Sequence, residues 1–426
     1  MRSPADLFTW LDTYVRPPNK VLITTRFRDF KGDYPVDVVG MTDKEAQELI
    51  GSVSASFGIQ KLITQDYAKE IIRESDGHPY VIKILLGEVA KAKRLVALKP
   101  IVASQDEILD ALFERTFAGL SPASKRIMFL LASWRSTVPE LAIHAVLARR
   151  SSEHMHVEDA VEELRKSSLV DVAVSPDGSR FLSVPLVAAE FGKRKLTTDQ
   201  SKSAVEADLE HLHQFGPGQK GDLEKGIAPR VARLFRQVNA AIKSRPETIE
   251  EHLPILEFVA QHYPPAWLEI ASLYERSVQL DRIDRAAAAV RRYLETEPDA
   301  DSQRYAWRHL AELCQVAEDW SGELHARVEL CLLPASDFDT ITETANRLNG
   351  LLARQQFFDT EEKRVLAQKL ARTMEARLNE ADATDHSRLA WLYLHLDDKS
   401  RAREVTQAGL RKEPGNEHCQ KLLSRF

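Results

Sequence analysis

The short apolar run at residues 21–25, Val-Leu-Ile-Thr-Thr, constrains the fold of this chain more than any other segment. Its β-branched composition predicts a strand that is covered on both faces, as in a parallel sheet. A valine-rich stretch at 36–39 suggests a second strand, and helical spacing at 5–14 precedes both. Parallel strands need neighbouring strands and helices on both faces, and these first residues supply almost none of them. Residues 1–40 are therefore expected to be part of a larger α/β sheet.

Helical patterns follow this segment. The sequence Thr-Asp-Lys-Glu at 42–45 forms a capping box, in which Glu45 reaches back to the helix start that Thr42 caps. We expect helices over residues 42–52, 64–75, 79–94, 105–118 and 121–134. The block from 41 to 100 is accordingly expected to be a small helical domain.

Residues 137–186 have a different pattern. They contain, in order, two helices, a strand, a Ser-Pro-Asp-Gly turn and a second strand, expected at 138–149, 157–167, 169–174, 175–178 and 180–184. Because the helix at 121–134 comes first, the order is three helices and then a hairpin, which is typical of a winged helix. The polar segment from Lys193 to Ala204 is expected to be a junction, and everything after it is expected to be helical.

Residues 251–426 carry a weak repeat of paired helices. The clearest copy has a leucine and several small or aromatic residues on two successive helices, and a closing proline: Leu389, Ala390, Tyr393, Ala402, Gly409 and Pro414. Two poorer copies contain Ala271, Tyr274, Ala286, Tyr293 and Pro298, and Leu310, Ala311, Cys314, Gly322 and Pro334. Helix pairs of about 34–40 residues that bury little alone must stack. This pattern predicts an α-solenoid similar to tetratricopeptide repeats, with an irregular α-bundle as the alternative.

The composition of the 426-residue chain excludes several classes of protein. Its formal net charge of −6 gives no general attraction to nucleic acid. No stretch approaches the roughly 18 apolar residues of a membrane span, and Met1 is followed by Arg-Ser-Pro-Ala-Asp instead of an apolar signal core. The three cysteines, Cys314, Cys331 and Cys419, are expected to be core residues in a reducing compartment. A cytoplasmic protein is expected.

Two motifs carry the functional interpretation. The first strand ends in Thr25-Arg26, which places polar side chains at the carboxyl edge of a sheet, where open α/β sheets bind ligands. An arginine there can donate charged hydrogen bonds to a phosphate. About fifty residues later, Gly77 suits a left-handed helix end and Pro79 suits the first turn of the next helix. Each motif alone also fits a plain structural role, a solvated arginine or a helix–turn–helix connection.

The order of these parts resembles the STAND signalling ATPases, which include NB-ARC and related bacterial regulators and defence proteins. The resemblance covers about residues 5–196. It implies a nucleotide site that contains Thr25, Arg26, Gly77 and Pro79, with Arg26 near the γ-phosphate and Pro79 packed against adenine. Many of these proteins carry a Met-His-Asp triplet at the end of the winged helix. The corresponding stretch at 181–186 has no histidine, which puts ADP sensing through that contact in doubt.

The printed sequence lacks the phosphate-binding and magnesium-binding motifs of such an ATPase. It has no G-x-x-x-x-G-K-[ST] and no apolar strand that ends in Asp-Asp or Asp-Glu. In the family both precede the Thr-Thr-Arg strand. We therefore expect this polypeptide alone to be no enzyme and to hold no cofactor, whereas a full-length parent would use ATP or ADP with Mg²⁺. A truncation, a split gene or a misplaced start would explain the absence.

DNA and metal binding are further hypotheses. The helix expected at 157–167 carries four acidic residues against two basic ones: Glu158, Asp159, Glu162, Glu163, Arg165 and Lys166. Net negative charge opposes contact with phosphates. Two histidine pairs, His154/His156 and His211/His213, lack accompanying cysteines or a suitable acidic cluster, so solvated histidines are expected there. Four tryptophans, Trp267, Trp307, Trp320 and Trp391, are expected to pack in the repeats, or to anchor a partner where exposed.

The expected architecture is mainly α. It comprises a partial NTPase remnant (1–40), a helical lid (41–100), a winged helix (101–198), a helical linker (199–250) and tetratricopeptide-like repeats (251–426). The favoured function is a fragment of a STAND-type switch of the bacterial regulation or defence type. Its repeats would bind a protein or peptide ligand, and its full-length form would form a homo-oligomer. A stand-alone repeat scaffold is the second hypothesis and a winged-helix DNA-binding regulator the third; we expect neither nucleic acid nor a membrane as partner.

Overall fold

The computed structural model describes residues 10–11, 13–16, 19–21, 40–98, 105–134, 136–148, 156–219, 221–245, 249–334, 336–353 and 360–426. The chain divides into two compact units, Met1–Ile101 and Val102–Phe426, and each is described by itself. Apart from Val21, both predicted strands of the first forty residues lie outside the described residues. The NTPase remnant therefore stays a prediction.

Three helices build the described part of the first unit: α2 (Asp43–Ser56), α3 (Gln65–Ser75) and α4 (Pro79–Ala92). The predicted capping box starts α2, because the Thr42 N–H donates to Glu45 Oε2 at 2.8 Å and the Glu45 N–H donates to Thr42 Oγ1 at 3.4 Å. Most of α4 is apolar and packs against α2 and α3, burying Val81, Ile82, Ile84, Leu85, Leu86 and Val89. The three helices predicted for this unit are confirmed.

The second unit begins with α5 (Gln105–Ala118) and a small sheet among helices. The elements that follow are α6 (Pro122–Ser133), β1 (Val138–Pro139), α7 (Glu140–Ala148), α8 (Val157–Lys166), β2 (Asp171–Val174) and β3 (Arg180–Ser183). The strands are antiparallel in the order β1-β3-β2, and Val138 and Val172 both lie opposite Leu182. This is the predicted order of helices and hairpin with one strand added. Residues 122–183 are called the three-stranded module below.

The added strand corrects one prediction. The helix expected over 138–149 begins at Glu140, because Val138 and Pro139 pair with β3 instead. Both residues are buried, and the short bridge gives β3 a partner on each edge. Two extended residues next to a helix leave no periodic signal, so the sequence pattern could not separate them from α7.

The segment from Lys193 to Ala204 also differs from the prediction. It was expected to be a polar junction, but it belongs mostly to α9 (Leu186–Thr198) and α10 (Lys202–His213). Leu196 is buried within it and Val205 directly after it, and α9 and α10 pack on α6. The many polar residues on the exposed faces concealed this narrow apolar stripe.

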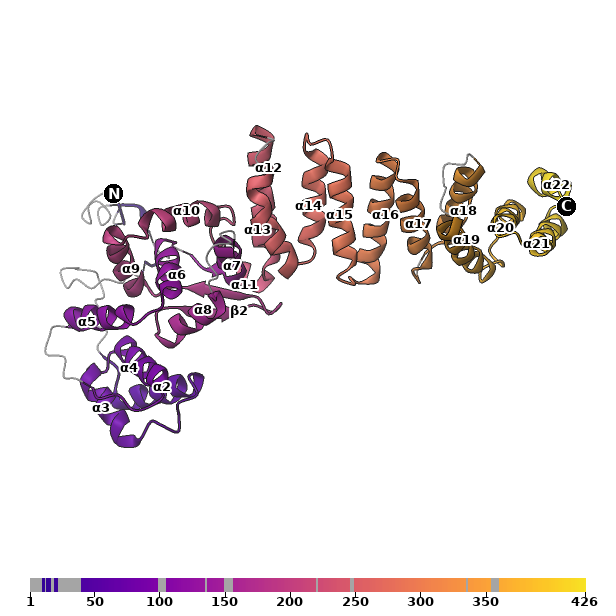
Figure 1. Cartoon of the computed structure of the whole chain (residues 1–426). Coiled ribbons are helices and arrows are strands. Elements are labelled where there is room, and N and C mark those ends of the chain that lie inside the picture. Colours follow the sequence, from indigo (N-terminus) through magenta and orange to yellow (C-terminus); the bar gives the residue numbers. More distant parts are fainter. Residues whose placement is uncertain are drawn as a thin grey trace. The chain divides into compact units, whose positions relative to one another are not determined.

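Helices fill the remainder of the second unit. They are α11 (Asp222–Lys225), α12 (Ala228–Ser244), α13 (Ile249–His262), α14 (Ala266–Arg276), α15 (Arg282–Leu294), α16 (Ala300–Val316), α17 (Trp320–Leu332), α18 (Phe338–Ala353), α19 (Thr360–Glu375), α20 (Ala383–His395), α21 (Lys399–Lys412) and α22 (Glu417–Leu423). From α13 onward each helix packs against the next one in the sequence, and the helices form a row (Figure 1). We call α13–α22 the repeat stack. Among the described residues, no helix meets the length and hydrophobicity that a membrane span requires.

Small and aromatic residues hold the paired helices together, as the repeat pattern predicted. The predicted pattern residues are buried in three helix pairs: Ala271, Tyr274, Ala286, Tyr293, Leu310, Ala311, Cys314, Leu389, Ala390, Tyr393 and Ala402. A Cβ on Gly409 would lie 2.9 Å from the His386 Cβ and 2.8 Å from the Cys419 Sγ. Glycine therefore lets α21 approach α20 closely. The arrangement is mainly helical and solenoid-like, as expected.

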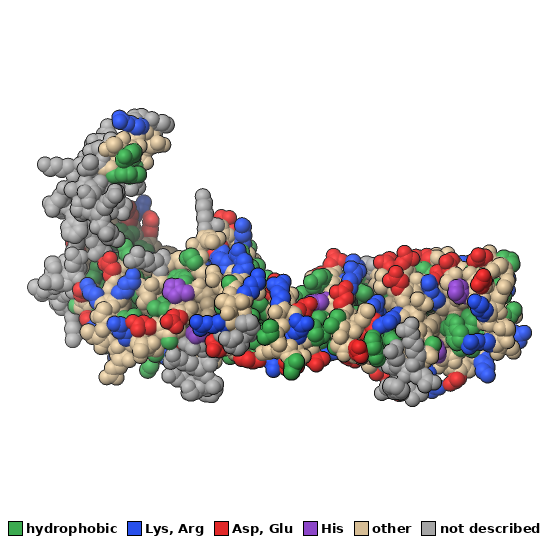
Figure 2. Space-filling view, turned by 90° about the horizontal axis from the view of Figure 1, so that it is seen from above, with side chains coloured by type: hydrophobic (Ala, Val, Ile, Leu, Met, Phe, Trp, Pro, Cys, Tyr) green, Lys and Arg blue, Asp and Glu red, His purple; other side chains and the backbone are tan. Residues whose placement is uncertain are grey.

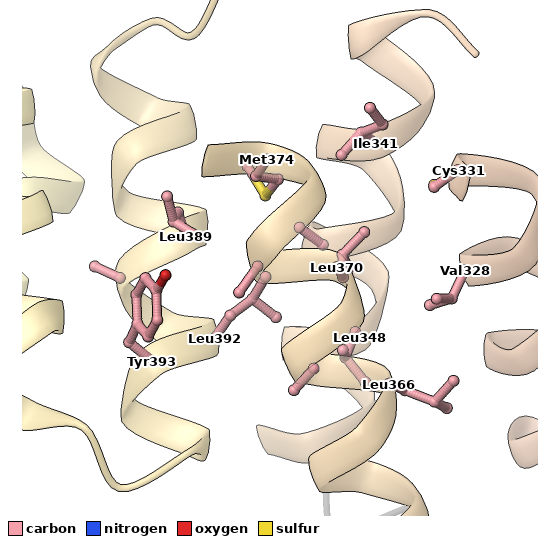
Figure 3. Packing of buried hydrophobic residues seen from close by; sticks show 14 of the residues in the cluster. Val328, Cys331, Ile341, Leu348, Leu366, Leu370, Met374, Leu389, Leu392 and Tyr393 are labelled. Carbon is pink, nitrogen blue, oxygen red and sulfur yellow. The ribbon is translucent and has the colours of Figure 1, made fainter. Parts of the chain in front are cut away.

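A large apolar cluster runs from α17 to α22. Figure 3 shows side chains of four successive helices meeting in it, among them Val328, Leu348, Leu370 and Leu392. All four are fully buried. Each helix therefore depends on its neighbours for burial, which is the property that makes helix pairs stack. The three cysteines are buried and unpaired, as expected of core residues.

Candidate functional site

Two of the four residues predicted to bind nucleotide fall within the described chain. Gly77 and Pro79 lie in the turn between α3 and α4, whereas Thr25 and Arg26 lie outside the described residues. The construction of the turn can therefore be followed in detail. The approach of Arg26 to it stays a prediction.

Gly77 is held against the chain segment that leads into α2. Its φ is +66°, a left-handed conformation that favours glycine. The Met41 N–H donates to the Gly77 carbonyl at 2.9 Å, and a Cβ on Gly77 would lie only 2.5 Å from the Met41 carbonyl oxygen. On the other side, a Cβ on Gly40 would lie 2.7 Å from the Asp76 carbonyl oxygen. Two backbone stretches therefore meet with no room for a side chain at either glycine.

His78 and Pro79 build the start of α4. The His78 Nδ1 accepts from the N–H groups of Tyr80 at 3.3 Å and Val81 at 3.4 Å, and so caps the helix. Pro79 is the first helical residue, a position at which the missing N–H costs nothing. Its ring is exposed, while Gly77 beside it is buried. The turn thus presents one apolar ring at a fixed place on the surface of the first unit.

Sequence reasoning found this turn but not its partner. The contact with Gly40 and Met41 joins positions that are far apart in the chain, and neither residue is part of a recognised motif. A usable signal was present, since Gly40 lies directly after the valine-rich stretch and two residues before Thr42, where the capping box begins. A glycine at the junction of a predicted strand and a helix indicates close backbone approach.

The hairpin turn of the three-stranded module is bound to the chain that follows it. Asp177 in this turn accepts from the Ser175 hydroxyl, from the Ser179 N–H at 3.0 Å and from the Ile227 N–H at 2.9 Å. Burial disfavours the charged Asp177 carboxylate, but these hydrogen bonds outweigh it and lower the pKa of Asp177 to about 2. Gly226 has a φ of +72° and no space for a Cβ beside Asp177. The turn is therefore occupied by an intramolecular contact.

The helix that would enter a DNA groove is also engaged internally. In α8, Glu163 Oε2 accepts from the Ser121 N–H at 3.1 Å and from the Ser124 hydroxyl at 2.7 Å, which ties α8 to the start of α6. Glu162 is paired with Arg165 at 2.7 Å and with Lys166 at 3.5 Å. The two basic residues of α8 are thus partly neutralised within their own helix, which reduces their attraction to phosphates.

Two arginines on α12 share one buried carboxylate. Arg230 is 1% exposed and donates to the backbone carbonyls of Gly216 and Thr137, and its Nε lies 3.5 Å from Asp222 Oδ2. Arg233 donates to the same carboxylate. Burial, together with the charge of Arg233, lowers the pKa of Arg230 to about 10, and Asp222 opposes this shift. Arg230 stays charged at neutral pH and attaches α12 to the residue that precedes β1.

Ion pairs link alternate helices along the repeat stack. Four of them place the acid on the earlier helix and the base on the later one: Glu250–Arg285 at 2.6 Å, Glu257–Arg292 at 3.7 Å, Glu329–Lys369 at 2.6 Å and Glu375–Arg401 at 2.9 Å. In a fifth pair, Arg291–Asp319 at 3.4 Å, the base lies on the earlier helix and the acid at the start of the later one. Exposed pairs of this kind each contribute less than about 1 kcal/mol. We call this series the inter-helix ladder. Side chains of both charges cover the surface in Figure 2.

One acidic residue of the stack is fully buried. The Glu323 carboxylate on α17 accepts hydrogen bonds from the Arg327 Nε at 2.8 Å and from the Arg347 guanidinium at 2.8–2.9 Å. Hydrogen bonding to Glu323 raises the pKa of Arg347, although burial opposes this. The Arg347 guanidinium also lies 5.4 Å from the centre of the Trp320 ring. A carboxylate with two cations in the core fixes how α17 and α18 meet.

Most of the tryptophans serve packing. Trp267 is buried, with the Arg292 guanidinium 4.8 Å from its ring centre, and Trp391 is half-buried, with Arg425 at the same distance. Tyr305 on α16 is 59% exposed, and its ring lies beside that of His309. His309 in turn lies 2.9 Å from Glu275 on α14. The described residues, which include His156, His211 and His213 but not His154, contain no group of three or more possible metal ligands.

Comparison with known proteins gives distant structural likenesses. No family model matches the chain, and no curated protein matches it. A solved structure with a similar arrangement is a Signal Transduction ATPase with Numerous Domains (STAND) protein with a tetratricopeptide repeat sensor from Pyrococcus horikoshii. It is 14% identical, with a TM-score of 0.31, over 90% of this chain and 61% of that chain. This chain thus spans less than two thirds of that protein, and so distant a likeness carries no argument about function.

Proposed function

We propose that this chain is part of a STAND-type nucleotide-dependent signalling switch, and that its repeat stack binds a protein or peptide ligand. The observation that carries the proposal is the stack itself, in which α13–α22 form a row of paired helices with a long accessible surface. Stacked helix pairs use such surfaces to bind proteins. The binding of a ligand to the repeats would be the input of the switch.

The nucleotide part of the proposal rests on Gly77 and Pro79. The turn offers what the resemblance requires, because Pro79 is exposed and is positioned by the His78 cap and the Gly77 contact. In the switch, Pro79 would pack against the adenine of ATP or ADP, and Thr25 and Arg26 would bind its phosphates. Magnesium and the phosphate-binding loop would come from the parent ATPase, which would assemble as a homo-oligomer.

We further propose that this chain alone does not hydrolyse ATP, since its sequence has no phosphate-binding lysine motif. The test is phosphate release by the full chain with ATP and Mg²⁺, beside a buffer control and the Arg26→Ala variant. Release no faster than the buffer control supports the proposal. Hydrolysis above that control that survives Arg26→Ala contradicts it.

The three-stranded module is proposed to act as an intramolecular spacer. Its hairpin turn is held by Asp177 against Ile227, and the acids of α8 face outward or cap α6. Both features oppose a DNA-binding role. The scaffold hypothesis shares the repeat surface with the switch hypothesis and differs only in lacking nucleotide control.

The test of ligand binding uses the full chain as bait in a lysate of the source organism, followed by chemical crosslinking of the captured protein. Crosslinks that map to α13–α22 support the proposal. Crosslinks confined to α2–α4 or to the three-stranded module contradict it. If capture on the repeat stack does not change when ATP or ADP is added to the full-length parent, the scaffold hypothesis replaces the switch.

A further inference from the structure

The first turn of α12 is bound to two separate parts of the three-stranded module. Asp177, in the turn between β2 and β3, accepts a hydrogen bond from the Ile227 N–H at 2.9 Å. Arg230, on the same turn of α12, donates to the carbonyl of Thr137, the residue before β1. One short stretch of helix therefore contacts the module at two places that lie far apart in the sequence.

The start of α12 depends on the module because it has little capping of its own. Its cap residue, Ile227, makes no side-chain cap, and the first turn contains no acidic residue. Pro229 suits a first helical turn, but its ring offers no acceptor to the N–H groups there. The Asp177 carboxylate supplies both an acceptor and the negative charge that the amino end of a helix favours. A residue of the module thus caps this helix.

The second contact also depends on the first turn of α12. Asp222 on α11 pairs with Arg233 and lies 3.5 Å from the Arg230 Nε, and all three side chains are buried. In the segment before α11, the Gly218 N–H donates to the Ser136 hydroxyl oxygen at 2.9 Å. Two buried cations share one carboxylate here, so their burial is compensated only while the helix holds them in place.

Beyond its first turn, α12 contacts the repeat stack. It packs against α13 and α14, and its buried residues there are apolar, among them Leu234, Phe235 and Val238. Burial raises the pKa of the Tyr263 phenol and the charge of Asp177 adds to that rise, so the hairpin turn lies near the end of α13. Because α7 packs directly on α13, α12 is a second connection between the module and the stack.

We propose that the first turn of α12 is a latch between the three-stranded module and the repeat stack, in which the Asp177 and Arg230 contacts hold or open together. The contacts of this turn with the module are polar and few, whereas the rest of α12 buries apolar side chains. A movement of α12 with the stack would therefore break the module contacts first. The inference rests on the proposed spacer role of the module and names the contacts through which a change in the repeats would reach it.

The test is hydrogen exchange of the full chain, read on peptides that cover the hairpin turn (175–179), β3 (180–183) and the segment before α11 (214–219). Asp177→Ala should speed exchange in the hairpin turn about tenfold, because hydrogen bonds to a charged acceptor are lost. It should also speed exchange about threefold in 214–219, where the Gly218 N–H binds Ser136 and not Asp177. The reason is that an uncapped first turn no longer holds Arg230 in place.

The matched control is Asp171→Ala, which removes one negative charge at an exposed position of the same hairpin. It should leave exchange in both segments unchanged. The reciprocal variant is Arg230→Met, which should speed exchange in 175–179 about threefold. When Asp177→Ala and Arg230→Met are combined, the total effect should be smaller than the product of the single effects, because a latch that is already open has little left to lose.

Two outcomes would overturn the latch. Faster exchange in 175–179 with no change in 214–219 would show that Asp177 supports only its own turn. Equal acceleration of β3 would show that the effect passes through the sheet instead of α12. Circular dichroism checks folding, and if Asp177→Ala unfolds, Asp177→Asn replaces it. That variant keeps an acceptor oxygen without the charge, so about twofold faster exchange in 214–219 is expected, and no change there contradicts the latch.

The latch and the proposed function can fail separately. Independent exchange at the two contacts would refute the latch and leave ligand binding by the repeat stack intact. A ligand that crosslinks outside the repeat stack would refute the proposed function and leave the coupled exchange in place.

Discussion

The turn at Gly77 and the repeat stack are held together by different kinds of contact. At the turn, two stretches of backbone touch at Gly77 and Gly40, and no side chain fits between them. In the stack, helices meet through many buried side chains, a buried charge cluster at Glu323 and exposed ion pairs. The turn therefore depends on a few atoms, while the stack distributes its stability over many residues.

This difference indicates what each region can do. A turn with one permitted geometry is suited to hold a ring such as that of Pro79 in place. A stack of similar helix pairs tolerates change on its surface, and can acquire a binding site there without losing its fold. In the stack, we expect a substitution to cost as much stability as one at the turn only where it removes a buried residue with several partners.

The largest effect is expected at Glu323. Glu323→Ala leaves Arg327 and Arg347 without their shared buried carboxylate, and should lower the free energy of unfolding of the stack by about 3 kcal/mol. The measurement is chemical denaturation followed by tryptophan fluorescence. The control is Glu257→Ala, which removes an exposed pair with Arg292 and should cost less than about 0.5 kcal/mol. Similar losses in the two variants would refute the distinction between buried and exposed charges.

The next effect is expected at Gly77. Gly77→Ala should destabilise the first unit by about 2–3 kcal/mol, because the new Cβ would meet the Met41 carbonyl and the φ is +66°. Gly58→Ala is the matched control, since Gly58 has a φ of +68° but nothing within 4 Å of an added Cβ. It should cost only about 1 kcal/mol. Hydrogen exchange of the α4 amides measures both changes.

If the two glycine variants open α4 to the same extent, the close approach of Gly77 and Met41 contributes nothing. The turn would then be an ordinary helix–turn–helix connection, and its comparison with the stack would lose its basis.

A smaller effect is expected from pH. Burial, and to a lesser degree the charge of Lys363, lower the pKa of His395 to about 4, from an ordinary value of 6.5. Between pH 6.5 and about 4 the unfolded chain binds a proton that the folded chain does not. The free energy of unfolding contributed by this site therefore falls as the pH falls through that window, by about 1 kcal/mol after allowance for its partial exposure.

His395→Phe keeps an aromatic ring beside Trp391 but cannot be protonated. Relative to the wild type, its stability should improve on going from pH 7 to pH 4.5, as measured by denaturation at both values. His418→Phe, at an exposed position, is the control and should show no such gain. A wild-type pH dependence that His395→Phe does not reduce would contradict this assignment.

Much of the fold could be predicted from the sequence because its signals are local. The capping box at Thr42 spans only four residues, and the small residues of each helix pair lie in a recognisable pattern along two successive helices. The strand β1 and the helices across Lys193–Ala204 were missed because short or narrow apolar patterns do not stand out. The order of helices and hairpin could be predicted, but the pairing of β1 with β3 could not.

The candidate sites depended on contacts between distant residues, and these the sequence could not supply. Gly77 and Pro79 could be identified by their residue types, but not the contact of Gly77 with Met41. Likewise, the Ser-Pro-Asp-Gly turn gave no indication that Asp177 would bind Ile227, fifty positions away. Such contacts follow from how the helices pack, which no local pattern encodes.

The most direct test of the account is hydrogen exchange of the full chain with and without its captured protein ligand. If the repeats bind the ligand, exchange should slow in the helices of the repeat stack and change little in the α4 amides next to Pro79. Slower exchange in α2–α4 with none in α13–α22 would contradict the claim that the repeats are the ligand-binding part of the molecule.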